Sequence, residues 1–138
     1  MKAYLDSSVL LRVLLNEEAP LPEWGVLAGG VTSTLAETEI LRSLDRARFA
    51  NQALDGRALA RRREEAYRLL EELELIELSR SILMRAAQPM PTPLGTLDAI
   101  HLVSAQAWQE ANGLVPFATH DRALAAAARA SGFHVIGA

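Results

Sequence analysis

Aspartate is scarce in this sequence, and three of its five aspartates fall at a strand-to-helix junction or in a first helical turn. Asp6 follows the apolar run 2–5, Asp121 follows the run 115–118, and Asp98 opens the helix after a proline-rich loop. In open parallel α/β sheets, ligands bind at the carboxyl ends of the strands. We therefore expect Asp6 and Asp121 to lie at one functional edge.

Each aspartate also has a purely structural interpretation. A carboxylate at a helix start accepts backbone N–H groups and interacts favourably with the helix dipole, so each acid taken singly resembles a cap. However, Ser7, Ser8 and Thr96 could already cap their helices, and Thr119 places a second short polar group at the same edge as Asp121. Taken together, the acids are therefore better explained as a functional cluster.

Glu39 is a fourth candidate acid. Thr34 and Glu37 have the spacing of a capping box, which accounts for Glu37. Glu39 lies two positions further, about 200° around the helix, and shares a face with Arg42 and Arg46. Spacing alone leaves open whether Glu39 is a site residue or the partner of a weak surface ion pair with Arg42.

Converging carboxylates repel one another unless a cation compensates their charge. Oxygen ligands in a chain without cysteine favour Mg²⁺ or Mn²⁺ over Zn²⁺. Such ions bind phosphates and activate water. An acidic cluster with no histidine pair at metal-ligand spacing is thus typical of phosphodiester chemistry. We interpret His101, one turn after Asp98, as a packing or hydrogen-bonding residue, His120 as an exposed loop residue and His134 as structural.

The elements that must position these acids alternate between short apolar runs and helical patterns, which favours a parallel α/β sheet covered on both faces. The predicted strands are 2–5, 31–33, 75–78, 115–118 and 133–136. The predicted helices are 9–15, 34–49, 54–73, 79–88, 96–111 and 122–130. With 138 residues, we expect a single domain over 1–138.

The composition is that of an ordinary globular protein, with 50% apolar residues and no apolar run long enough to span a bilayer. We expect a cytoplasmic location and no membrane partner.

The net charge is −3, so any RNA-binding charge must be local. Arg42 and Arg46 are the better phosphate candidates, because they share a face with Glu39. The run 61–63 is interpreted as a solvated face paired with nearby glutamates, and Trp24 and Trp108 as core or interface residues.

Four segments resemble the successive motifs of PIN domains, in order and spacing: Tyr4–Ser8, Thr32–Leu44, Thr96–Leu102 and Phe117–Leu124. The second places the family acid on Glu39. The resemblance covers essentially the whole chain, and its compact length is most similar to VapC toxins of type II toxin–antitoxin pairs. The Pro-rich segment 90–95 departs from the family pattern and affects the expected target preference.

The resemblance implies a three-layer α/β/α fold with a parallel sheet ordered 3-2-1-4-5. It implies one or two Mg²⁺ or Mn²⁺ ions held by Asp6, Asp98 and Asp121, with Glu39 helping to activate water and with Ser7 and Thr119 orienting the carboxylates. It further implies endoribonuclease cleavage of single-stranded RNA or of RNA loops, homodimerisation and inhibition by a small VapB-type antitoxin. The alternatives are an RNA-processing nuclease without a toxin role and a non-catalytic binding module.

Overall fold

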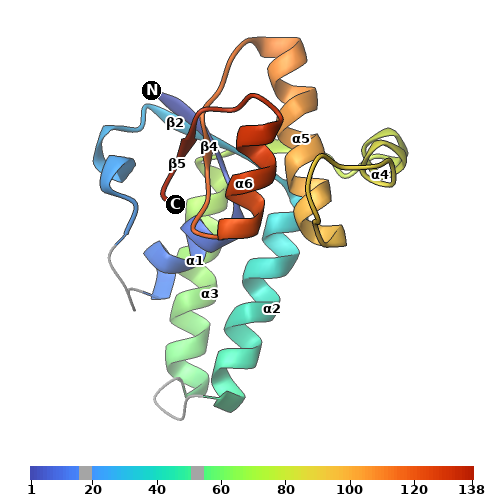
Figure 1. Ribbon diagram of the computed structural model, residues 1–138. Coiled ribbons are helices and arrows are strands. Elements are labelled where there is room, and N and C mark those ends of the chain that lie inside the picture. Colours follow the sequence, from blue (N-terminus) through green and yellow to red (C-terminus); the bar gives the residue numbers. More distant parts are fainter. Residues whose placement is uncertain (16–19, 51–54) are drawn as a thin grey trace.

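The computed structural model describes residues 1–15, 20–50 and 55–138 and is built on a parallel five-stranded sheet (Figure 1). Its order is β3-β2-β1-β4-β5, which confirms the predicted topology. The strands are β1 (Lys2–Leu5), β2 (Gly29–Ser33), β3 (Glu74–Ile76), β4 (Phe117–Ala118) and β5 (Val135–Ile136). The carboxyl ends of all five strands therefore point to the same edge.

Helices cover both faces of this sheet, as the predicted three-layer arrangement requires. Successive residues of β1 point to opposite faces: Leu5 packs in the cluster with α1, α2 and α3, whereas Tyr4 packs with α5 and α6. The helices are α1 (Ser7–Leu15), α2 (Thr34–Ala50), α3 (Gly56–Glu71), α4 (Arg80–Ala86), α5 (Thr96–Asn112) and α6 (Arg122–Ala130), with a 3₁₀ turn η1 (Pro22–Val26).

The last two strands are shorter than predicted, for reasons visible in their hydrogen bonds. Pro116 has no N–H to donate, so the ladder of β4 begins at Phe117, whose N–H donates to His134 at 2.8 Å. The N–H of Phe133 donates to the carbonyl of Ala128, which ties Phe133 to the end of α6. The predicted strand start at Phe133 was therefore wrong, and β5 begins at Val135.

The capping at the start of α2 also differs from prediction. The hydroxyl of Ser33 accepts the N–H of Leu35 at the start of α2, while Thr34 accepts the N–H of Leu78 from beyond β3. The predicted capping role of Thr34 was thus wrong, because its hydroxyl serves the link to Leu78. Helix α3 begins at Gly56 with Asp55 as its cap; the predicted start at Leu54 lies outside the described residues.

Helices α2 and α3 pack side by side as a hairpin that projects well beyond the carboxyl edge of the sheet (Figure 1). The acids predicted at that edge therefore lie beside the base of a long helical arm. Within the described residues, no helix is long and apolar enough to cross a membrane.

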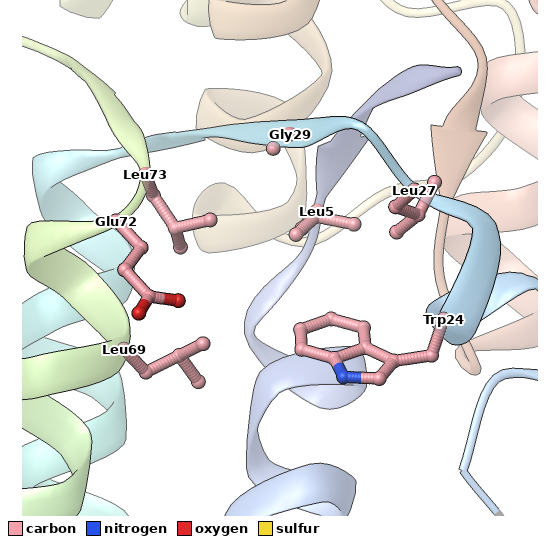
Figure 2. A pocket seen from close by; sticks show the side chains of 8 residues that line it. Leu5, Trp24, Leu27, Gly29, Leu69, Glu72 and Leu73 are labelled. Carbon is pink, nitrogen blue, oxygen red and sulfur yellow. The ribbon is translucent and has the colours of Figure 1, made fainter.

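A recess of about 180 Å³ separates η1 from the C-terminal end of α3. Figure 2 shows Trp24 and Leu27 on one side of it and Leu69 and Leu73 on the other. At its base, Gly30 has no room for a side chain, since a Cβ there would lie 2.5 Å from Leu5 Cδ1. Trp24 is thus part of the apolar packing around β1 and β2, as predicted.

Trp108 lies at the opposite edge of the sheet from the predicted acids. Its indole N–H donates to Glu74 at 3.0 Å, and the ammonium group of Lys2 lies 5.6 Å from its ring centroid. Lys2 and Glu74 are the first residues of β1 and β3, so this cluster marks the amino ends of the strands. Its position makes Trp108 a structural residue, in agreement with the prediction.

Candidate active site

A cavity of about 550 Å³ at the carboxyl edge of the sheet brings all four predicted acids together. Asp6 follows β1, Asp121 follows β4, Glu39 comes from α2 and Asp98 from α5. Its wall also contains the predicted Ser7, Arg42 and Arg46, while its other lining residues are Ser8, Leu11, Leu35, Thr38, Ser43 and Leu97. Segments far apart in the sequence thus converge on one polar site.

Asp6 is held by hydroxyl groups on both of its carboxylate oxygens and is only 3% exposed. Ser7 donates to Oδ1 at 3.3 Å, while Ser8 and Thr119 donate to Oδ2 at 2.7 and 2.8 Å. The structure thus gives Ser7 and Thr119 the contacts predicted for them. It adds Ser8, which the sequence suggested only as a helix cap and which also accepts the backbone N–H of His120.

Thr119 connects the acids that follow the two central strands. Its fully buried hydroxyl donates to Asp6 and accepts the backbone N–H of Asp121 at 3.0 Å. Asp121 in turn accepts the N–H of Leu124 through Oδ1 at 2.9 Å, so it caps α6. Asp121 is therefore a helix cap, as its structural interpretation from the sequence held, and it also lines the acidic cavity.

Asp98 lies half-buried in the first turn of α5, close enough to the other acids to be perturbed by them. Burial raises its pKa to about 6, and the negative charges of Asp121 and Asp6 act in the same direction. Gly95 occupies the cap position of α5 without any side-chain hydrogen bond. The expected capping by Thr96 was thus wrong, because Thr96 is already the first helical residue.

His101 is the residue whose importance the sequence understated. It is fully buried, and its Nε2 donates to Glu39 Oε1 at 2.5 Å and lies 3.7 Å from Asp6 Oδ1. Its Nδ1 is hydrogen-bonded to the Tyr4 hydroxyl at 2.8 Å. The predicted hydrogen-bonding role of His101 is confirmed. Its partner is Glu39, one of the four predicted acids. The available signal was its position three residues after Asp98, on the same side of α5.

The surroundings of His101 favour its protonated form. Burial lowers the pKa of His101, but the hydrogen bond to Glu39 and the charge of Asp6 outweigh this effect and raise it overall. The pKa of Tyr4 is raised well above its usual value, first by burial and then by Asp6, so the phenol keeps its proton. Tyr4 stacks on Phe117 with ring centroids 5.1 Å apart, which anchors this chain of polar groups in the core.

Arginines form the rim of the cavity on the side of α2. Arg42 pairs with Asp45 at 3.1 Å and Arg46 donates to Ser43 at 3.2 Å, and both remain on the surface. On α3, Arg62 pairs with Glu65 and Arg68 with Glu64, as expected of a solvated helix face. The arginines in the cavity wall, Arg42 and Arg46, are therefore those predicted from their shared face with Glu39.

The donor set is that of a site for a hard divalent cation. Four carboxylates line one cavity without any sulfur donor, and burial together with the charges of Asp121 and Asp6 raises the pKa of Asp98. Across residues 1–15, 20–50 and 55–138, no three acidic or histidine side chains stand ready-made around a single ion position. Mg²⁺ is usually held by one or two carboxylates together with water, so the site does not need such a cluster to bind it.

Comparison with known proteins agrees with this arrangement. Residues 3–130 match the model of the PIN domain family. The chain is 31% identical over 137 residues to Ribonuclease VapC47 of Mycobacterium tuberculosis, which covers 94% of this chain and 92% of that protein. It is 34% identical over 111 residues to Ribonuclease VapC46 of the same species, covering 75% and 73% respectively.

A solved structure shares the fold. A chain of a toxin–antitoxin complex from Klebsiella pneumoniae superimposes with a TM-score of 0.59 over 89% of this chain and 90% of that one, at 16% sequence identity. The fold, the cavity at the carboxyl edge and the match over residues 3–130 lead to one conclusion: the chain belongs to the PIN-domain family and is related to VapC ribonucleases.

Proposed function

We propose that this protein is a Mg²⁺- or Mn²⁺-dependent endoribonuclease that acts as the toxin of a type II toxin–antitoxin pair. The observation that carries the proposal is the convergence of Asp6, Glu39, Asp98 and Asp121 on one cavity with arginines at its rim. Carboxylates beside cationic side chains suit an RNA phosphate better than a neutral substrate. Relatives named ribonucleases support the same reaction.

Asp6, Asp98 and Asp121 are the proposed ligands of one or two ions. When bound, the metal would polarise the scissile phosphate and stabilise the charge that develops during displacement. Asp6 is prepared for this role, because three hydroxyl donors fix its two oxygens. The pKa of Asp98 is raised first by burial and then by Asp121 and Asp6, and a bound cation would offset the repulsion from these two acids.

Glu39 is the proposed group that orients and deprotonates the attacking water. Its Oε1 accepts the His101 proton, which leaves Oε2 for the cavity. A fixed carboxylate within reach of the phosphate can accept a proton from water as the new P–O bond forms. Arg42 and Arg46 are proposed to bind flanking phosphates and hold the RNA strand in place.

Partners and setting follow from the same proposal. We propose that a VapB-type antitoxin inhibits the enzyme, because relatives carry the VapC name and a protein of the same fold was solved as a toxin–antitoxin complex. We also propose a homodimer in the cytoplasm. Induction of the chain alone should arrest growth, and co-expression of its antitoxin should restore it; uninhibited growth on induction would contradict the toxin role.

The decisive experiment compares cleavage of single-stranded RNA by wild type, Asp98→Asn and Asp55→Asn, with Mg²⁺, with Mn²⁺ and with excess EDTA. Asp55 caps α3 away from the cavity, and asparagine caps equally well, so Asp55→Asn is a matched control. We expect cleavage by wild type and control only in the presence of metal, and none by Asp98→Asn. Full activity in EDTA would refute the metal mechanism.

A further inference from the structure

The catalytic cavity continues outward along α2 as an exposed row of side chains. Arg42 and Arg46 belong to the cavity wall. Phe49 follows Arg42 by seven residues, which is about two helical turns, so it lies on the same stripe about 10 Å further along the axis. Its side chain is 74% exposed. A flat aromatic surface thus stands next to the arginines that lead away from the acids.

What distinguishes Phe49 from an ordinary exposed apolar residue is the arginine on its ring. The guanidinium of Arg48 lies 4.3 Å from the ring centroid. Asp45 accepts from Arg48 at 3.2 Å and from Arg42 at 3.1 Å, so one aspartate connects the cavity rim to this pair. Exposed pairs of this kind are weak, and both arginines can exchange Asp45 for a phosphate.

The charge of this region is opposite to that of the rest of the protein. Residues 42–65 contain seven arginines, two aspartates and two glutamates, a balance of +3, so the remainder of the chain carries −6 within the net charge of −3. Within the part of the chain that the structure describes, these residues lie in the outer portions of α2 and α3, the hairpin that projects from the sheet (Figure 1). Such a basic surface on an acidic protein favours a polyanion over an apolar protein partner.

We propose that Arg42, Arg46, Arg48 and Phe49 form an RNA-anchoring surface that holds single-stranded RNA beyond the scissile phosphate. The arginines bind successive phosphates, and an unpaired base stacks on Phe49. The proposal rests on the ribonuclease function proposed above and names the residues that hold the strand outside the cavity. A base within a duplex cannot be offered to a side chain in this way, so the preferred target has unpaired nucleotides beside the cleavage position.

The binding test uses a fluorescently labelled single-stranded RNA of about twelve nucleotides and protein carrying Asp98→Asn to prevent cleavage. We expect Phe49→Ala to weaken binding about tenfold and Phe49→Trp to restore it, since stacking needs only an aromatic face. Leu114→Ala is the matched control, because Leu114 is 93% exposed but lies outside the hairpin. Unchanged affinity in Phe49→Ala would overturn the proposal.

Salt dependence tests the arginines separately. Each phosphate contact to a single strand contributes about 0.7 to the slope of log affinity against log salt concentration. Arg46→Gln combined with Arg48→Gln should therefore reduce that slope by about 1.4, whereas Leu114→Ala should leave it unchanged. An unaltered slope in the double variant would show that these arginines do not contact phosphates.

Cleavage kinetics separate this surface from the catalytic site. With the acids intact, Phe49→Ala should raise the KM for the long RNA and preserve its kcat, while a substrate of about four nucleotides should be cleaved as by wild type. Loss of antitoxin binding with RNA binding intact would make the surface a protein contact and overturn the proposal. If wild type cleaves no RNA but Phe49→Ala still weakens binding, the nuclease function fails and the RNA surface stands.

Discussion

Asp98→Asn should stabilise the metal-free protein at neutral pH, although it should abolish cleavage. Asp98 is packed among carboxylates, and its pKa is raised from 3.8 to about 6, first by burial and then by Asp121 and Asp6. Charging this group on folding therefore costs free energy. A shift of this size corresponds to about 3 kcal/mol, but solvent contact at the cavity mouth reduces the expected cost to about 1 kcal/mol.

The sign of the pH dependence follows from the direction of that shift. Because the folded state holds the proton more tightly than the unfolded state, the wild type is favoured below pH 3.8 and loses this stability as the pH rises through about 6. Asparagine cannot ionise, so Asp98→Asn should exceed wild type only above that range. The groups facing Asp98 are Asp121, Asp6 and Glu39, which repel it, and His101, which attracts it.

Thermal unfolding in EDTA at pH 4, 6 and 8 is the appropriate assay. At pH 8 we expect the Tm of Asp98→Asn to exceed that of wild type by roughly 3–5 °C for a chain of this length, with no difference at pH 4. Saturating Mg²⁺ should raise the Tm of wild type and remove the advantage of the variant. A variant that is less stable than wild type at pH 8 without metal would refute this account of the acidic cavity.

Three further outcomes are expected from substitutions around the site. His101→Gln should lower the cleavage rate about 10- to 100-fold by releasing Glu39, with a loss of stability of about 1–3 kcal/mol seen in urea unfolding; an unchanged rate would remove His101 from the site. Thr119→Val should reduce the rate at least about tenfold and Thr119→Ser should restore most of it, unless the bond to Asp6 is dispensable. Gly30→Ala should destabilise the fold by about 1–3 kcal/mol while kcat at low temperature stays near that of wild type, and a neutral effect on stability would show that Leu5 and Leu73 can move aside.

The parallel sheet was predictable from the alternation of short apolar runs and amphipathic helices, whereas its strand order was predicted from the resemblance to PIN domains. Strand ends were less predictable, since they depend on partners elsewhere. Phe133 looks like a strand residue by composition, but its N–H is taken by the carbonyl of Ala128. Thr34 looks like a cap, but its hydroxyl meets Leu78, a contact 44 residues away in sequence.

The four acids were also predictable only where their local position in the chain determines where they lie in the fold. Asp6 and Asp121 could be placed from their positions after strands, because parallel strands bring such positions to one edge. Glu39 could not be separated from a surface residue by spacing, since its partner His101 lies 62 residues further along the chain. The role of Ser8 could not be predicted for a similar reason. Its position in the sequence suggests a helix cap, and only the fold brings the backbone N–H of His120 to its hydroxyl.

The aromatic residues behind the sheet limit how this protein can change during evolution. Phe133 packs against Phe117, which stacks on Tyr4, whose hydroxyl holds His101 against Glu39. Phe133 is remote from the substrate. Because these rings are close-packed, a substitution that moves Phe133 would also move Phe117 and Tyr4, and through His101 it would change the position of the Glu39 carboxylate. Descendants that give up catalysis could replace His101 with some loss of stability, because its buried hydrogen bonds would be lost, but they would still need Phe117 for folding. Descendants that keep catalysis must therefore inherit the core and the site together.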